Sequence, residues 1–390
     1  MKRSVRHPGR TGVTPTVVFL HSSTELYGSD RMLLNVLDTL PPALTPEVWL
    51  PHDVPLAEHG LVAQLDARGI SWRVEQLPVL RRRYLKSPLG LLRLIARSFT
   101  LFALLRRSGA PAVYLATSAL LVAGPVARLA GCAPVLVHVQ EIWSGVEGQV
   151  LGLLGRSAHA AICISTAVSE SVRGPLGRRS RVIVNAVEDP PLPPVPLPAG
   201  EARLRYVMAS RWNAWKGHGT LLAAWNDGPP PGLLTILGGP PPAGESVDVP
   251  AMVGGLLAPE SVEVRGEVAS TTPAIDESDF LVVPSDSPEP FGLVAIEAFS
   301  RGRAVVGSDG GGLRDIVEDG VTGRLFPLGD ARALRRVLDS LSREDARTMG
   351  RRAREEFERR YSLNRYREDF EAVWRPLLRE SGQAERRYSV

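Results

Sequence analysis

Two series of short apolar segments, one on each side of a proline-rich stretch, constrain the fold of this chain most strongly. The segments are rich in Val, Ile and Leu, and helical patterns fill the intervals between them. Uninterrupted runs of this kind are typical of strands buried on both faces, which occur in parallel sheets with helical crossovers. The sequence therefore predicts an α/β fold with two doubly wound domains. The predicted strands are 16–21, 47–50, 112–116, 135–139, 160–164, 181–184, 204–209, 233–237, 262–264, 280–283 and 304–307.

The stretch from Pro190 to Pro198 has six prolines in nine positions. Proline fixes φ and lacks an N–H, so this stretch cannot form a helix or a central strand. We interpret residues 189–198 as an extended, stiff linker, with a long surface loop inside one domain as the alternative. The two domains are then 1–188 and 199–363. A two-domain α/β protein binds its ligand at the carboxyl ends of its strands, in the cleft between the domains.

Composition excludes several classes of protein. Hydrophobic residues make up 44% of the chain and charged residues 23%, which is typical of a globular protein and not of a disordered or fibrous one. Cys132 and Cys163 are too few for a disulfide scaffold, so we interpret both as buried thiols of a reduced, cytoplasmic protein. We identify no membrane span and no secretion signal in the sequence.

Basic charge is concentrated in one region of the chain. Residues 76–140 contain no Asp or Glu but nine Arg or Lys, while the whole chain has a net charge of only +4. One basic region on an otherwise acidic chain is unlike a general nucleic-acid binder. Within it, residues 81–107 include an amphipathic helix with Arg93, Arg97 and Arg107 on one face. This pattern predicts peripheral contact with an anionic membrane; a domain-packing helix with a solvated arginine edge is the alternative.

The stretch 279–298 carries the clearest signs of a binding site. A buried strand ends at Pro284, a polar loop follows, and we expect a helix to open near Phe291. The free backbone N–H groups of Phe291, Gly292 and Leu293 would then favour an anion such as a diphosphate.

Two glutamates and two cations accompany this predicted helix start. Glu289 and Glu297 offer carboxylates that accept hydrogen bonds from vicinal hydroxyls. The alternative is that Glu289 is a charge at the helix N-terminus and that Glu297 lies on a solvated face of the helix. Arg211 and Lys216 follow another predicted strand and could converge on a diphosphate. The alternative is that Lys216 is an ordinary surface lysine. Only three lysines occur in the whole chain, which favours a functional reason for Lys216.

The sequence Glu-Pro-Phe-Gly-Leu at 289–293, followed by Glu297 and Ala298, resembles the paired-glutamate motif of glycosyltransferase family 4. The match continues through Gly302, 305–306, 311–312 and 318–323. The resemblance implies the GT-B fold, in which two Rossmann-like domains face a central cleft, and a retaining enzyme that needs no metal or other cofactor. It implies that Glu297 binds the ribose hydroxyls, that Glu289 binds the transferred sugar, and that Arg211 and Lys216 bind the donor diphosphate.

The resemblance also implies contacts from the N-terminal domain. Gly28 lies in a loop before a helix and is a candidate donor contact, although Ser29 stands where the family usually has a second glycine. His138, at a strand end, is the best match to a histidine that contacts the transferred sugar, and Gln140 is the alternative for that position. The C-terminal helix, within 364–390, is expected to pack back on the N-terminal domain.

Together these features predict a retaining glycosyltransferase of the hexosyltransferase type. It would move a sugar from a nucleoside-diphosphate donor to a hydroxyl of a carbohydrate or lipid-linked acceptor, in cell-envelope, capsular polysaccharide or glycolipid biosynthesis, at the inner face of the cell membrane. A nucleotide-sugar epimerase of the same fold and a non-catalytic GT-B scaffold are the alternatives. A dinucleotide-dependent oxidoreductase is less favoured, because no G-x-G-x-x-G pattern is completed. The sequence leaves the base, the sugar and the acceptor open.

Overall fold

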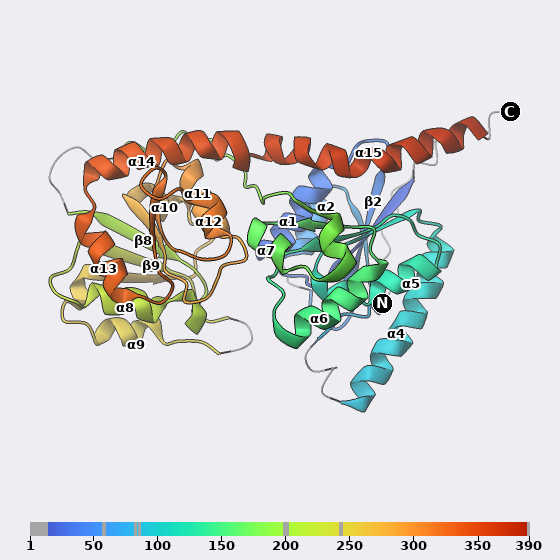
Figure 1. The fold of residues 1–390 in the computed structure, drawn as a ribbon, viewed down its shortest axis with the longest axis horizontal. Helices are drawn as coiled ribbons and strands as arrows, with labels where there is room; N and C mark the ends of the chain where they lie inside the picture. Colours follow the sequence, from blue (N-terminus) through green and yellow to red (C-terminus); the bar gives the residue numbers. More distant parts are fainter. Residues whose placement is uncertain are drawn as a thin grey trace. The chain divides into compact units, whose positions relative to one another are not determined.

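The computed structural model describes residues 15–56, 60–81, 84, 87–197, 203–241 and 245–387, with side chains up to residue 378. Contacts divide the chain into two units. The first comprises residues up to 185 together with residues from 364 onward, and the second comprises residues 186–363. Each unit is a parallel sheet flanked by helices (Figure 1).

The first unit is built on a seven-stranded sheet in the order β3-β2-β1-β4-β5-β6-β7, with every neighbouring pair parallel. The strand order reverses between β1 and β4, as in a doubly wound fold. Its strands are β1 Thr16–Leu20, β2 Thr45–Pro51, β3 Ser71–Glu75, β4 Ala112–Leu115, β5 Val135–Val139, β6 Ala160–Cys163 and β7 Ser180–Val182. Its helices are α1 Gly28–Asp38, α2 Leu61–Ala67, α4 Pro88–Ser108, α5 Ala123–Leu129, α6 Gly145–Leu154, α7 Thr166–Ser171 and α15 Leu363–Arg387.

The second unit repeats the same plan with six parallel strands in the order β10-β9-β8-β11-β12-β13. Here the order reverses between β8 and β11. Its strands are β8 Arg205–Ala209, β9 Leu233–Leu237, β10 Val262–Gly266, β11 Phe280–Val283, β12 Ala304–Ser308 and β13 Gly323–Phe326. Its helices are α8 His218–Trp225, α9 Val249–Gly254, α10 Thr272–Glu277, α11 Leu293–Ser300, α12 Leu313–Ile316, α13 Ala331–Ser340 and α14 Arg343–Glu356.

The predicted α/β class with two doubly wound sheets is confirmed, and each predicted strand is present with ends that differ by two residues at most. Two strands were not predicted: β3 and β13, both at the edge of their sheet. Both contain charged residues, such as Arg73 in β3 and Arg324 in β13, because an edge strand is only partly buried. They therefore lack the continuous apolar pattern that marks the central strands.

The proline-rich segment packs on the second unit, so it does more than link the domains. Arg301 donates hydrogen bonds to the carbonyl oxygens of Leu192 and Pro193, at 2.6 and 2.9 Å, and Arg303 donates to that of Val195 at 2.7 Å. Both arginines are 2% exposed. Arg301 also pairs with Asp276 at 2.7 Å, which balances its buried charge. The expected linker, of which the structure describes 189–197, is thus fixed to one of the units it connects.

The basic region differs from the expectation in one respect. Arg97 does not lie on an exposed face of its helix: it is 7% exposed, and its guanidinium group pairs with Asp53 at 3.2 Å. Arg81 pairs with the same carboxylate at 2.9 Å. Burial alone would raise the pKa of Asp53, but the hydrogen bonds from Arg81 and Tyr84 outweigh it and hold that pKa below its usual range. The remaining basic residues at 82, 83 and 86 lie outside the described residues.

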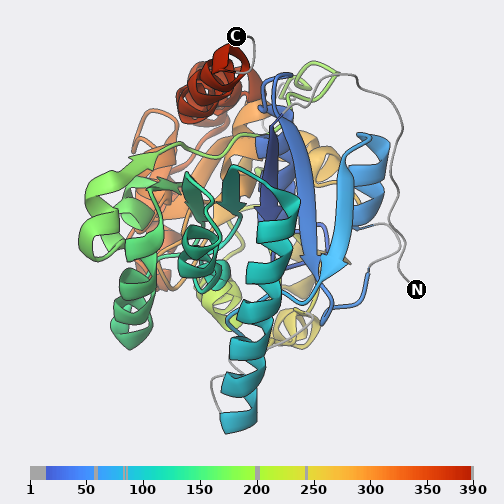
Figure 2. The ribbon, with the colours of Figure 1, turned by 90° about the vertical axis from the view of Figure 1, so that its right-hand side faces the viewer.

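Helix α15, drawn in dark red in Figure 2, packs on the first unit, and the contact is made by a cluster of aromatic side chains. Trp374 is fully buried, and its ring lies 6.2 Å from that of Phe19 and 5.8 Å from that of Tyr114, centroid to centroid. Its indole Nε1 donates a hydrogen bond to Thr39 Oγ1 at 3.0 Å. The end of the chain therefore completes the core of the unit that begins the chain.

We predict that Trp374→Ala lowers the free energy of unfolding by about 3–5 kcal/mol, because it leaves a cavity in this core and removes the hydrogen bond to Thr39 Oγ1. Arg375→Ala, at an exposed position on the same helix, is the control and should change stability little. Chemical denaturation of both variants measures the difference. Equal stability of the two variants would show that α15 does not contribute to the core.

Candidate active site

The predicted cations and the first glutamate lie at the carboxyl ends of β8 and β11, the two strands between which the strand order of the second unit reverses. Arg211 follows β8 and is half-buried. Lys216 ends a short turn, Ala214–Lys216, just before α8. Glu289 lies in the loop between β11 and α11. This position is where open α/β sheets bind ligands.

Lys216 and Glu289 form an ion pair, with 2.8 Å between Nζ and Oε1. Glu289 is 4% exposed, so its charge needs partners within the protein. Ser285 supplies a second one, since its hydroxyl donates to the same carboxylate oxygen at 2.5 Å. The Lys216 side chain is 22% exposed, and its ammonium group lies over the ring of Trp215, 4.1 Å from the centroid. The pair thus joins a buried carboxylate to a cation that solvent can reach.

The loops that carry this pair are held against each other by close backbone contacts. Gly217 has a φ of +77°, and a Cβ atom at this position would overlap with the carbonyl oxygen of Pro284. The backbone N–H of Asp286 donates to the carbonyl oxygen of Trp215 at 2.8 Å. Thr220 Oγ1 donates to Asp286 Oδ1 at 2.6 Å. A glycine is therefore required next to Lys216, because a side chain would separate the two loops.

A third loop, between β12 and α12, fixes the backbone of Glu289. The N–H of Gly312 donates to the carbonyl oxygen of Glu289 at 2.7 Å, and Gly311 forms a parallel bridge with Glu289. Gly311 has a φ of +61°, and a Cβ atom there would overlap with the same carbonyl oxygen. Glu289 is thus positioned by its main chain as well as by its side chain.

The helix after this loop begins later than expected. Gly292 has a φ of +117°, and α11 starts at Leu293, not near Phe291. The left-handed conformation of Gly292 interrupts the helix, because a helical residue has a negative φ. The Phe291 side chain is 3% exposed and packs against Tyr361, with 6.3 Å between ring centroids. Of the three predicted amide donors, Gly292 and Leu293 thus stand at the N-terminus of α11, and Phe291 precedes it as a core residue.

Glu297 lies more than one turn into α11 and is half-buried. Its Oε2 accepts a hydrogen bond from Thr271 Oγ1 at 2.9 Å. Sequence reasoning did not single out Thr271 or Ser285, the residues that hold the two glutamates. No local pattern marks them, since serine and threonine are common in loops and only the folded arrangement brings each to its carboxylate.

In the first unit, Gly28 is the first residue of α1, at the carboxyl end of β1. The start of this helix is held by Asp30, which accepts from the backbone N–H of Tyr27 at 2.9 Å and lies 2.8 Å from His21 Nε2. Burial alone would raise the pKa of Asp30, but its hydrogen bond with His21 helps to lower it overall. The loop with Gly28 is therefore anchored from inside the unit.

His138 is not a surface residue in this structure, and its contact with a donor sugar stays a prediction. Its side chain is fully buried, and its ring contacts those of Tyr114 and Phe370, with centroid distances of 6.0 and 6.4 Å. Burial lowers the pKa of His138 to about 3, so the imidazole is neutral. Gln140, the alternative, is half-buried just beyond β5 and donates to the carbonyl oxygen of Ala116 at 2.9 Å.

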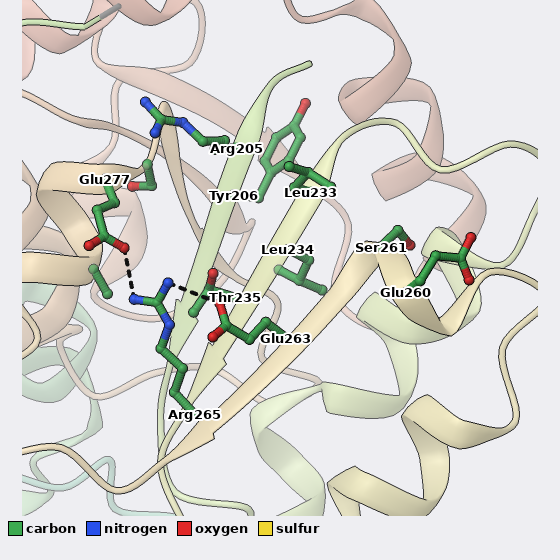
Figure 3. A pocket seen from close by; sticks show the side chains of 12 residues that line it. Arg205, Tyr206, Leu233, Leu234, Thr235, Glu260, Ser261, Glu263, Arg265 and Glu277 are labelled. Atoms are coloured by element: carbon green, nitrogen blue, oxygen red, sulfur yellow. Dashed lines mark hydrogen bonds and ion pairs between the residues drawn. The ribbon is translucent and has the colours of Figure 1, made fainter. Parts of the chain in front are cut away.

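A cavity of about 330 Å³ lies at the opposite end of the second sheet (Figure 3). It is lined by the first residues of β8, β9 and β10 and by the end of α10. In Figure 3, Arg265 reaches between Glu263 and Glu277, to which it pairs at 2.9 and 2.8 Å. This cavity does not include Lys216 or Glu289 and is separate from the candidate active site. Within the described ranges, no group of three His, Cys, Asp or Glu side chains is arranged to hold a metal ion.

Comparison with known proteins finds a family similarity within the second unit. Residues 203–344 match the model of the glycosyl transferases group 1. This region is therefore similar to a group 1 glycosyltransferase domain, and we refer to the second unit as the group 1 domain. It contains Arg211, Lys216, Glu289 and Glu297, all of which lie within the matched residues.

Curated relatives of the group 1 domain align with part of their length. A phosphatidyl-myo-inositol mannosyltransferase of Mycobacterium leprae is 35% identical over 104 residues, which are 26% of this chain and 27% of the relative. An N-acetyl-alpha-D-glucosaminyl L-malate synthase of Bacillus anthracis is 27% identical over 150 residues, 38% of each chain. The chain thus spans well under half the length of these relatives.

The fold is similar over nearly the whole chain. The structure of Anabaena HepE in complex with UDP-glucose has a TM-score of 0.75 and 20% sequence identity, and the match covers 93% of this chain and all of HepE. The predicted GT-B fold is therefore confirmed, with the group 1 domain as its second unit.

We predict that Gly217→Ala destabilises the group 1 domain more than Gly320→Ala does. Both glycines have a φ of +77°, but a Cβ atom at Gly320 meets no atom within 4 Å. The Gly320 variant therefore loses only about 1–2 kcal/mol of unfolding free energy, because alanine is strained at a positive φ. The Gly217 variant must in addition separate two loops. Thermal unfolding of both variants tests this. Equal losses would contradict the close contact between Gly217 and Pro284.

Proposed function

We propose that this chain is a retaining glycosyltransferase that moves a sugar from a nucleoside-diphosphate donor to a hydroxyl group of its acceptor. The observation that carries the proposal is the Lys216–Glu289 pair at the carboxyl ends of β8 and β11, inside a group 1 glycosyltransferase domain. A partly exposed cation beside a buried, positioned carboxylate suits a site that binds phosphate and sugar hydroxyls together.

In the proposed reaction, the bond between the anomeric carbon and the diphosphate oxygen breaks, and a bond to the acceptor oxygen forms on the same face of the sugar. The acceptor proton passes to the leaving phosphate. Lys216 turns from Glu289 to the phosphate oxygens and, with Arg211, stabilises the negative charge that develops on the leaving group. Arginine offers two parallel donors to a phosphate, while the lysine ammonium acts as a compact charge.

The carboxylates and the helix start complete the proposed donor site. Glu289, released from Lys216, accepts hydrogen bonds from the transferred sugar and stays oriented by Ser285. Glu297 accepts hydrogen bonds from the ribose, beside Thr271. The amides of Gly292 and Leu293, at the N-terminus of α11, favour the anionic diphosphate. Gly28 and Gln140 are candidate contacts from the first unit.

The relatives support a nucleotide sugar as the donor and a glycolipid or envelope carbohydrate as the product. HepE is similar in fold and is known in complex with UDP-glucose. The mycobacterial relative is, by its name, a mannosyltransferase that acts on phosphatidyl-myo-inositol, a lipid. We extend both classes to this chain, with the site in the cytoplasm and a peripheral contact between residues 81–107 and an anionic membrane. Two buried, unpaired cysteines agree with a reducing compartment.

We predict that Lys216→Ala lowers the transfer rate by ~10²-fold or more, because it removes a donor that stabilises the leaving group. Glu297→Ala should instead weaken donor binding, which is measured as a smaller rise in melting temperature with added UDP-, GDP- or ADP-sugars. Arg332→Ala, at an exposed position on α13, is the control for both. A Lys216→Ala variant with the wild-type rate would remove the proposed role of this residue.

We also predict that the transfer rate is unchanged by excess EDTA, because the proposed charge stabilisation comes from Arg211 and Lys216. The measurement is release of nucleoside diphosphate with and without the chelator, on protein that has been dialysed against it. A loss of rate that added divalent cations restore would contradict the metal-independent mechanism. A product that forms without an acceptor and retains its nucleotide would instead indicate an epimerase.

A further inference from the structure

Helix α4 has two apolar faces, and only one of them packs on residues that the structure describes. The packed face consists of Gly90, Leu94, Arg97, Leu101 and Leu105, which recur at the spacing of one side of a helix. The other side carries large apolar side chains in solvent. They are Leu89, Leu91, Leu92, Ile95, Phe99 and Phe102, with exposures from 38% for Phe102 to 73% for Phe99.

The packed face holds α4 firmly on the first unit. A Cβ atom at Gly90 would overlap with the backbone of Tyr84, so the helix start lies directly on that residue. Arg97 pairs with Asp53, which also accepts a hydrogen bond from Tyr84 Oη at 2.6 Å. Separation of α4 from the unit would break the buried ion pair between Asp53 and Arg97, which has a high cost in free energy.

This attachment decides how α4 can meet a membrane. Contrary to the expectation from the sequence, α4 is long and apolar enough to cross a bilayer, and only 22% of its apolar window is buried. A spanning helix, however, would have to leave Asp53 and carry Arg97 into the hydrocarbon. A helix that stays on the protein and presents one apolar face lies in the interfacial region of the bilayer instead.

Helix α6 adds a second exposed apolar row to the first unit. Val146, Val150 and Leu153 are 75%, 49% and 62% exposed and follow each other at helical spacing. Figures 1 and 2 show α4 and α6 reaching toward the same side of this unit, the lower side in both views. Monomeric proteins seldom expose so many large apolar side chains together without a partner.

We infer that α4 and α6 together form a membrane-docking surface, whose apolar side chains insert into the interfacial region of an anionic bilayer. The charge pattern of the two helices favours anionic lipid. Arg93, Arg106 and Arg107 of α4 are exposed, and no acidic residue occurs from 76 to 140; Glu147 is the acidic residue on α6. Arginines beside an apolar face favour anionic headgroups. They disfavour a second copy of the chain, because two α4 faces would bring like charges together.

The inference refines the proposed membrane contact: insertion of apolar side chains supplies most of the binding, and the arginines supply the preference for anionic lipid. It does not depend on catalysis, so its failure and that of the proposed enzyme activity are distinguishable. Docking is measured without donor or acceptor, and donor binding is measured without lipid.

The test is flotation of the full chain with vesicles of phosphatidylcholine, alone or with about one third phosphatidylglycerol. We expect the wild type to float with the anionic vesicles. The double variant Leu92→Ser/Phe99→Ser should lose ~10-fold or more in partition coefficient, because two large apolar side chains no longer enter the lipid. The triple variant Arg93→Gln/Arg106→Gln/Arg107→Gln should lose the preference for anionic vesicles.

Leu257→Ser is the matched control, since Leu257 is 81% exposed but belongs to the second unit. Its partition should equal that of the wild type, and the melting temperature and the donor-induced shift of every variant should be unchanged. Wild-type partition of the Leu92/Phe99 variant overturns the inference. So does a wild type that floats with neither kind of vesicle, or one that forms a dimer that the same substitutions dissociate in the absence of lipid.

Discussion

A carboxylate that is almost completely buried needs compensation, and at Glu289 that need organises the surrounding loops. The side chain is satisfied by Lys216 and Ser285, which come from the loops after two neighbouring strands, and its main chain is held by Gly312 from a third. Each partner must arrive at the correct place, because a buried charge left with partial compensation is expensive. The stability of this part of the group 1 domain and the geometry of the proposed donor site are thus set by the same contacts. In the proposed reaction, Lys216 leaves Glu289 for the donor phosphate, and hydroxyl groups of the transferred sugar become the new hydrogen-bond donors to the carboxylate.

The doubly wound topology explains why residues far apart in the chain meet at this point. β8 and β11 are adjacent although the sequence between them contains two further strands, so their following loops leave the sheet side by side. Lys216 and Glu289, 73 positions apart, become neighbours for this reason. Glycines 217 and 311 allow the loops to touch backbone to backbone, which no other residue type permits at those conformations. The first unit repeats the arrangement at β1 and β4, where Gly28 opens α1.

Sequence reasoning located the central strands and the residues of the candidate site for physical reasons that also explain its failures. Strands buried on both faces have a continuous apolar pattern, whereas the edge strands β3 and β13 are half-solvated and were missed. The family resemblance assigns a sugar contact to His138, whereas in the structure its side chain points into a cluster of aromatic rings. Arg97 was taken for an exposed charge because helical periodicity cannot reveal Asp53, which belongs to a different segment. Ser285 and Thr271 were not singled out, since their roles depend on distances that exist only in the folded chain.

The contacts of the proline-rich segment determine the N-terminal structural boundary of the group 1 domain. Family similarity starts at residue 203, but two guanidinium groups in the interior of the domain use the carbonyl oxygens of Leu192, Pro193 and Val195 as acceptors. A fragment that starts at the family boundary would leave these guanidinium donors of Arg301 and Arg303 without their carbonyl acceptors. Expression of this domain alone therefore requires a start near Ala186. The proline-rich segment is then retained, although its sequence resembles a linker, because it is a structural part of the domain.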